Sequence, residues 1–141
     1  MKRASHFGIF LFLLVSLGCA VNRTYAPPAV RVSSIKYVKR DPIHYLGIFA
    51  NRKVPFHVAY NSEKAELIVT MKNAALPAMK KALHADPDVI EEVKQEYVID
   101  NDGSVLSNVR IQLAKPYKYH VTQASFGIKV AIDASQTISA P

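Results

Sequence analysis

Basic and aromatic side chains gather late in the chain, and their types suit an anionic sugar polymer. Lys115, Tyr117, Lys118 and Tyr119 lie within five residues of one another. Tyrosine rings can stack on sugar rings, while lysine and arginine form charge-assisted hydrogen bonds with carboxylates. The predicted ligand-binding residues are Arg52, Lys53, Arg110, Lys115, Tyr117, Lys118 and Tyr119, with Arg52 and Lys53 in the equivalent turn of an internal repeat. The alternative is a solvated turn region without a ligand.

Other reactive side chains lack the spacing that chemistry requires. His57 and His120 have no cysteine, aspartate or glutamate at ligand spacing, so we expect exposed strand residues and no metal site. The run from Asp100 to Gly103 resembles the start of a calcium loop, but Ile111 stands where such a loop has glutamate, which favours a hairpin turn. No nucleophile elbow is present. We therefore expect a non-enzymatic protein without a cofactor.

The elements that must position these residues include two similar hairpins. Apolar residues alternate with others at 56–60 and again at 67–71, on either side of the turn-forming residues 61–64. The same pattern returns at 116–122 and 128–132, where Tyr119-His120-Val121 matches Phe56-His57-Val58. A duplicated hairpin predicts a domain built from two like halves.

The remaining segments complete a predicted count of four strands, one helix and four strands. Further strands are expected at 32–38, at 43–50 with a bulge at Gly47, at 89–99 and at 105–113. Leu76, Met79 and Leu83 have helical spacing, so a short helix is expected from Pro77 to His84. The predicted fold class is all-β with one short helix, a two-sheet β-sandwich whose two similar four-stranded halves face each other.

The first twenty residues indicate export. Lys2 and Arg3 precede an uncharged apolar run at 7–17, which is shorter than the roughly 20 residues of a membrane-spanning helix. Such a run is typical of a signal peptide. It ends beside Cys19, the only cysteine, in a context that resembles a bacterial lipobox. We expect Cys19 to be lipidated, and cleavage after Ala20 with loss of Cys19 is the alternative.

This interpretation divides the chain into four parts and sets its location. Residues 1–20 are the signal peptide, 21–30 a tether, 31–134 the β-sandwich domain and 135–141 a disordered tail. A lipidated Cys19 followed by Ala20 resembles Gram-negative lipoproteins of the outer membrane, which implies a periplasmic domain anchored to that membrane. Acyl chains would hold the protein there.

The charge of the exported part favours polyanionic partners. Lysine and arginine number 18 against 11 acidic residues, and removing Lys2 and Arg3 leaves 16 against 11, a net charge of +5. In the cell envelope the available polyanions are lipid head groups and the carboxylates of the cell wall. Export argues against nucleic acid as a partner.

The region from Arg31 to Ala134 resembles the AMIN domain. The likeness rests on two similar strand units, on aromatic-x-Val hairpins, and on an apolar-x-Val-x-apolar strand that ends in Lys72-Asn73-Ala74-Ala75-Leu76. AMIN domains occur in bacterial cell-wall amidases and in type IV pilus secretins as non-catalytic modules. The resemblance implies a stand-alone module that binds peptidoglycan.

A second hypothesis gives the chain a protein partner. An assembly or pilotin-like lipoprotein would bind a secretin or pilus component by pairing an exposed strand edge with it. A degenerate remnant of a larger secretin gene is a third possibility. Retention on cell-wall sacculi distinguishes the first hypothesis from the second.

Overall fold

The computed structural model describes residues 30–78 and 83–139, and these residues form strands and no helix. The strands are β1 (Val30–Arg40), β2 (Ile43–Ala50), β3 (Phe56–Asn61), β4 (Glu66–Lys72), β5 (Ala74–Ala75), β6 (Ile90–Ile99), β7 (Val105–Leu113), β8 (Tyr117–Ala124) and β9 (Gly127–Thr137). Eight of the nine match the strands expected from alternation, and only the two-residue β5 is new. The predicted all-β class is confirmed.

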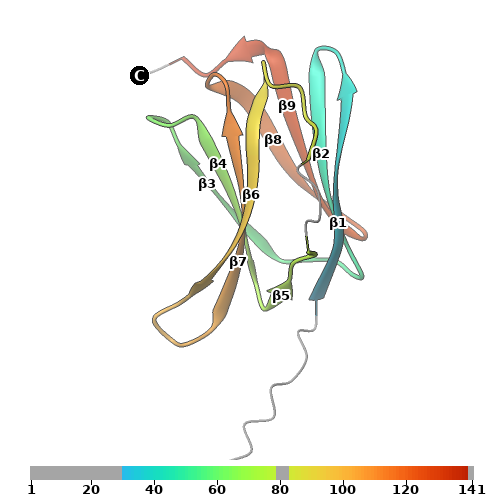
Figure 1. Cartoon of the computed structure of the whole chain (residues 1–141), viewed down its shortest axis with the longest axis vertical. Coiled ribbons are helices and arrows are strands. Elements are labelled where there is room, and N and C mark those ends of the chain that lie inside the picture. Colours follow the sequence, from blue (N-terminus) through green and yellow to red (C-terminus); the bar gives the residue numbers. More distant parts are fainter. Residues whose placement is uncertain (1–29, 79–82, 140–141) are drawn as a thin grey trace, which may run out of the picture.

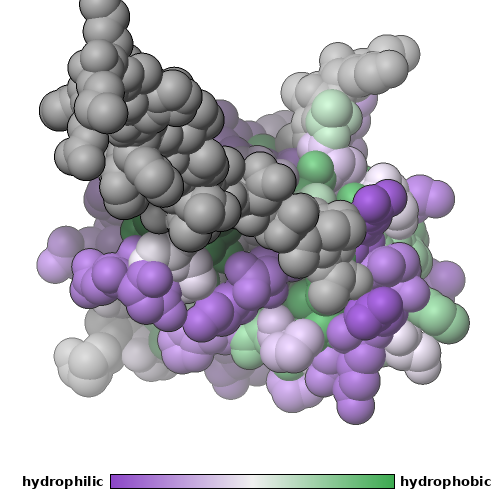
Figure 2. Space-filling view, turned by 90° about the horizontal axis from the view of Figure 1, so that it is seen from below, coloured by the Kyte–Doolittle hydropathy of each residue, from purple (hydrophilic) through white to green (hydrophobic). Residues whose placement is uncertain are grey.

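Two sheets pack face to face (Figure 1). One has five strands in the order β5-β1-β2-β9-β8, and the other has four in the order β3-β4-β7-β6. Inward-facing residues of both sheets form one apolar core, which includes Leu46, Val69, Val109 and Val130, all fully buried. Seen from the end at which β1 begins, hydrophilic residues surround the hydrophobic ones (Figure 2).

The short helix expected from Pro77 to His84 is not found. Residues 77, 78, 83 and 84 are not helical, and 79–82 lie outside the described residues. The apolar residues of the connection from β5 to β6 still cover the core, because Leu76, Leu83 and Ala85 pack against it.

The two halves of the chain interleave, which corrects the prediction of halves that face each other. The first half supplies β1–β2 to the five-stranded sheet and β3–β4 to the other sheet, and the second half supplies β8–β9 and β6–β7 in the same way. Replacing each strand by its repeat equivalent turns the order β1-β2-β9-β8 into β6-β7-β4-β3. The strand order therefore has an internal two-fold correspondence.

The duplicated hairpins share one register. Equivalent pairs across the two hairpins are Phe56–Met71 with Tyr119–Ile132, and Val58–Val69 with Val121–Val130. The correspondence extends to an irregularity that the sequence did not reveal. The β1–β2 pairing shifts between Val32 and Ser34, and the β6–β7 pairing shifts between Ile90 and Glu92, at equivalent positions.

The structure differs from the sequence prediction at one expected bulge and at the end of the last strand. No bulge occurs at Gly47, which pairs in regular register with Lys36 on one side and Lys129 on the other. Strand β9 continues to Thr137, beyond the expected domain end at residue 134, because Tyr117 pairs with Thr137 and the Ile138 amide donates to the Pro116 carbonyl. These bonds order residues that were assigned to a tail.

Candidate functional site

Small residues hollow the outer face of the five-stranded sheet. The pairing registers place outward residues in cross-strand rows, which run Val38-Tyr45-Ala131-His120, Lys36-Gly47-Lys129-Thr122 and Ser34-Phe49-Gly127-Ala124. In the two central strands each row pairs one small residue (Ala131, Gly47 or Gly127) with one large residue. The sequence of the strands thus produces a depression instead of a flat surface.

Gly47 forms the floor of this depression. A Cβ atom at Gly47 would lie only 2.7 Å from Cε2 of Phe49, so the absence of a side chain is what lets the Phe49 ring lie across the strand. Gly127, beside it on β9, has φ +137° and would place a Cβ 1.9 Å from the Ile48 carbonyl oxygen. Gly127 requires glycine for its backbone as well as its size, whereas a side chain at Gly47 would displace the Phe49 ring.

The resulting groove has a volume of about 460 Å³ and an almost entirely apolar surface. Its walls come from β1, β2, β9 and the β8–β9 turn. The lining residues are Lys36, Val38, Tyr45, Gly47, Ile48, Phe49, Ala124, Ser125, Phe126, Ile128 and Lys129. Three of its apolar side chains are exposed: Val38 at 48%, Phe49 at 45% and Phe126 at 66%. Exposed apolar residues that are gathered in a concavity are typical of a binding surface.

Two lysines give the groove a positive edge. Lys36 Nζ lies 5.6 Å from the centre of the Phe49 ring, and Lys129 Nζ lies 5.7 Å from that of Tyr45. Both are cation–π distances, so the aromatic rings hold the two charges at the sides of the hollow. No aspartate or glutamate lines the groove. The site can therefore receive a flat apolar group together with an anion.

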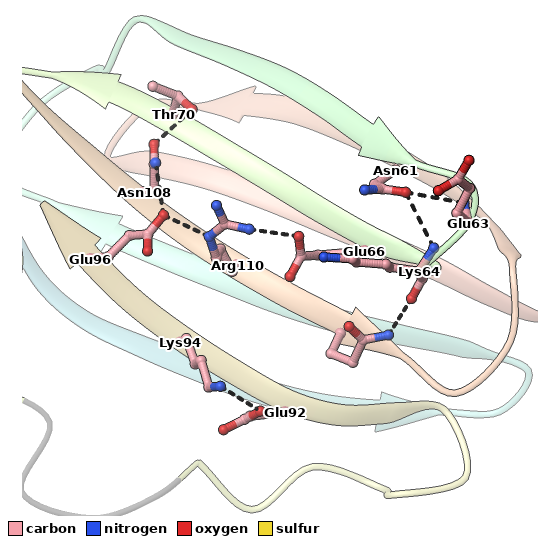
Figure 3. Close-up of polar contacts among 11 residues, drawn as sticks. Asn61, Glu63, Lys64, Glu66, Thr70, Glu92, Lys94, Glu96, Asn108 and Arg110 are labelled. Carbon is pink, nitrogen blue, oxygen red and sulfur yellow. Dashed lines mark hydrogen bonds and ion pairs between the residues drawn. The ribbon is translucent and has the colours of Figure 1, made fainter. Parts of the chain in front are cut away.

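The outer face of the four-stranded sheet is organised differently (Figure 3). Arg110 donates from Nε to Glu96 and from Nη1 to Glu66, both at 2.6 Å. Asn108 extends this network by donating to Glu96 at 3.2 Å and accepting from the Thr70 hydroxyl at 2.8 Å. The face is occupied by its own hydrogen bonds and ion pairs.

The network shifts the pKa values of its members. The hydrogen bond from Arg110, with a second from Asn108, lowers the pKa of the Glu96 carboxyl, and the bond to Glu96 raises the pKa of Arg110. Charges that neutralise each other in this way are not available to a ligand. The predicted ligand residue Arg110 is thus committed to two carboxylates.

The predicted binding residues are not brought together. Arg52 and Lys53 lie in the β2–β3 connection, beside the β8–β9 turn, because Ala50 donates to the Phe126 carbonyl and Gln123 to that of Val54. Lys115 lies at the other end of the sandwich, beside the β3–β4 turn, where Leu113 donates to the Ala65 carbonyl (Figure 1). Arg52 and Lys115 follow equivalent strands of the two halves, and they lie at opposite ends of the sandwich.

The remaining members of the predicted set divide between core and surface. Tyr117 is buried, and its hydroxyl donates to the Asp88 carbonyl, so its ring belongs to the core. Tyr119 is half-buried, with its ring centre 5.2 Å from that of Tyr60. Lys118 is exposed on the outer face of β8, near Asp133 in the pairing register. Of these three residues only Lys118 is exposed.

The histidines take different positions. His57 and His120 are exposed, as predicted, on the edge strands of different sheets. His44 is buried, with Nδ1 2.6 Å from the Tyr37 hydroxyl. Among the described residues no group of three or more His, Cys, Asp or Glu could hold a metal ion. Residues 30–78 and 83–139 include no helix of the length and hydrophobicity that a membrane crossing requires.

One sequence signal could have located the groove. Strand β2 reads Ile43-His44-Tyr45-Leu46-Gly47-Ile48-Phe49-Ala50, so its outward positions carry Tyr45 and Phe49 as well as a glycine. A sheet strand with apolar residues on both faces is covered on both faces or exposes one of them. Alternation of inward residues alone does not reveal such a strand, because the signal lies in its outward residues.

Comparison with known proteins identifies no relative of this chain. Neither a protein-family model, nor a curated protein, nor a solved structure matches the chain.

Proposed function

We propose that this chain is a non-enzymatic module of the bacterial cell envelope that binds peptidoglycan. The signal-like residues 1–20 support export, and Cys19 supports a lipid anchor at the outer membrane with the domain in the periplasm. The AMIN-like strand pattern supports the choice of ligand. Residues 1–29 lie outside the described residues, so the export and the anchor are inferred from the sequence.

The observation that carries the proposal is the hollow, aromatic, positively edged groove. The faces of sugar rings present C–H groups, which pack well on the rings of Tyr45 and Phe49. The stem peptides of peptidoglycan carry carboxylates, and Lys36 and Lys129 are placed to pair with them. We therefore assign ligand binding to this groove instead of to the basic and aromatic residues predicted from the sequence, which lie apart in the fold.

Co-sedimentation with purified sacculi tests the proposal. Residues 21–141, which contain every described strand and the whole core, should be retained at low salt and released by added salt. The double variant Lys36→Glu/Lys129→Glu should reduce retention by about tenfold or more, since each charge-assisted bond contributes about 1.5–3 kcal/mol.

The internal repeat supplies the matched control. Lys94 is the equivalent of Lys36 on the other sheet and is exposed beside Glu92 at 3.2 Å. Lys94→Glu should leave retention unchanged, and Lys118→Glu tests the site expected from sequence. Retention that falls equally in Lys94→Glu and in the single variant Lys36→Glu would indicate binding by net charge alone. A wild-type domain that stays in the supernatant contradicts the proposal.

A second function is favoured by the open edge of β8. Among the described residues, this eight-residue strand pairs only with β9 and ends the five-stranded sheet, so its other backbone edge can take a further strand. A secretin or pilus component could add a strand there. The Gln123 amide faces away from β9, because Gln123 and Ile128 form a non-hydrogen-bonded pair next to the closing pair Ala124–Gly127. A stoichiometric protein partner from envelope extracts, lost on Gln123→Pro and kept by the groove variant, would support this function instead.

A further inference from the structure

The end of the sandwich at which β1 begins collects three chain segments from distant parts of the sequence. The Asn51 amide donates to the Arg31 carbonyl, and the Arg31 amide donates to the Asn51 side chain. The Ala50 amide donates to the Phe126 carbonyl. These bonds hold the start of β1, the β2–β3 connection and the β8–β9 turn together on one surface.

Two exposed apolar side chains project at this end. Phe126 stands in the two-residue turn between β8 and β9 and is 66% exposed. Ile99, at the end of β6, is 75% exposed. The β6–β7 turn belongs to the same end, because Asn73 donates to the Val105 carbonyl while its neighbour Ala74 pairs with Val30. Large apolar residues at turn tips can insert into the interface of a bilayer.

Basic residues surround Phe126. Arg31, Arg52 and Lys53 are all exposed, and no acidic residue occurs in the segments 30–35, 47–56 or 121–129 that form this side of the end. The acidic residues of this end are Asp100 and Asp102 in the β6–β7 turn, and Asp102 lies 3.5 Å from Lys72. The surface around Phe126 is therefore complementary to an anionic surface.

The chain leading to the proposed anchor enters at the same place. Cys19 precedes Val30 by eleven residues, which span at most about 40 Å when fully extended. A lipidated Cys19 would thus keep this end, and not the opposite one, nearest to the bilayer.

We infer that the Phe126 end, defined by Arg31, Arg52, Lys53 and Phe126, is a second binding surface, whose partner is an anionic phospholipid bilayer. The inference rests on the lipid anchor of the proposed function and goes beyond it, because the domain itself contacts the lipid. Contact through this end turns the β3–β4 and β7–β8 turns away from the membrane. It also fixes the groove, which Phe126 borders, next to the bilayer surface.

Vesicle sedimentation of residues 21–141, which lack Cys19, tests this surface without the anchor. The domain should sediment with vesicles of phosphatidylglycerol and phosphatidylcholine, and not with phosphatidylcholine alone. Each basic residue near an anionic surface contributes about 1 kcal/mol, so Arg52→Gln/Lys53→Gln should weaken binding about 25-fold. Phe126→Ser should weaken it further.

A control of equal charge sits at the opposite end. Lys64 and Lys115 are exposed there, and Lys64→Gln/Lys115→Gln removes the same charge without touching the Phe126 end. Equal losses in the two double variants, or no binding to anionic vesicles, would overturn the inference. If Arg52→Gln/Lys53→Gln loses vesicle binding but keeps sacculus retention, the two surfaces are separate. If the wild-type domain binds vesicles but not sacculi, peptidoglycan is not its ligand and the membrane-binding surface still stands.

Discussion

The outer faces of the two sheets occupy equivalent positions of the internal repeat, yet they differ in almost every residue. Gly47 on the five-stranded sheet corresponds to Arg110 on the other, since Lys36 pairs with Gly47 as Lys94 pairs with Arg110. Tyr45 corresponds to Asn108 in the same way. One face is a hollow with rings and two lysines that form no ion pair with any described residue, and the other is filled by an arginine that binds two carboxylates.

This difference shows at which positions of the repeat the type of residue is constrained. The inward positions keep their apolar character in both halves, because the shared core needs it. The outward positions have no common core to fill, so each face could acquire its own chemistry. A face whose hydrogen bonds are satisfied internally stabilises the fold, whereas a face with exposed rings and free charges is suited to a ligand.

The largest expected effect comes from giving the hollow face a side chain at Gly127. Gly127→Ala combines a φ of +137° with a Cβ 1.9 Å from the Ile48 carbonyl oxygen, so we expect a loss of about 3 kcal/mol or more in unfolding free energy. Urea denaturation measures it. Gly103→Ala, on the other sheet, has φ +81° with no atom within 4 Å and should cost only the backbone strain, about 1 kcal/mol. Equal losses would contradict the crowding argument.

Removing one cation from each face should separate their roles. Arg110→Ala leaves Glu66 and Glu96 without their partner, and Glu66 has a side chain only 16% exposed, so a loss of about 2 kcal/mol is expected. Lys36→Ala should change stability by about 0.5 kcal/mol or less, because Lys36 has no ion-pair partner among the described residues. Urea unfolding of both variants, each compared with wild type, provides the measurement. A reversed order would mean that the hollow face also stabilises the fold.

A smaller change should reshape the groove with little effect on the fold. Gly47→Ala meets only the far edge of the Phe49 ring, which can rotate away, so the expected loss in stability is about 1 kcal/mol or less. The displaced ring should narrow the hollow and weaken sacculus retention. Arg110→Ala is the comparison at the equivalent position, and its retention should stay normal once the protein is folded. Unchanged retention in Gly47→Ala would argue that the floor of the groove does not contact the ligand.

The smallest effect is a pH dependence confined to the filled face. Arg110 lowers the pKa of Glu96 below its ordinary value of 4.5, so the stability that Glu96 contributes is complete above pH 4.5 and is lost as the pH falls through the folded-state value. The difference in unfolding free energy between wild type and Arg110→Ala should therefore shrink below pH 4.5. The difference in unfolding free energy between wild type and Lys36→Ala should not shrink in this way, because no carboxylate of the described residues lines the groove. Parallel urea titrations across this pH range check both.

Most of the strands could be predicted from the sequence, because alternation records directly which residues face the core. The positions of Val58 and Val69, for example, indicate both that a strand is present and which of its faces points to the core. The equivalence of the two hairpins also followed from the sequence, and their common register confirms it. Such features depend on residues close together in the chain.

The arrangement of the hairpins could not be predicted, because it depends on long-range pairing. Nothing local in β2 says that it pairs with β9 or that β4 pairs with β7, and these two pairings interleave the halves. For the same reason Arg52 and Lys115 were expected together and lie apart. Tyr117 shows a further limit, since a tyrosine between two lysines in sequence can still be buried when a strand end turns its ring inward.

The interleaved strand order has a consequence for ancestry. Either half alone forms two hairpins that belong to different sheets, and two copies of one half would rebuild the whole strand order as a symmetric homodimer. In such a dimer both outer faces would be identical by symmetry. Fusion of two half-length genes into one chain removes that restriction, so the specialisation of a single face is a property that only the fused protein could evolve.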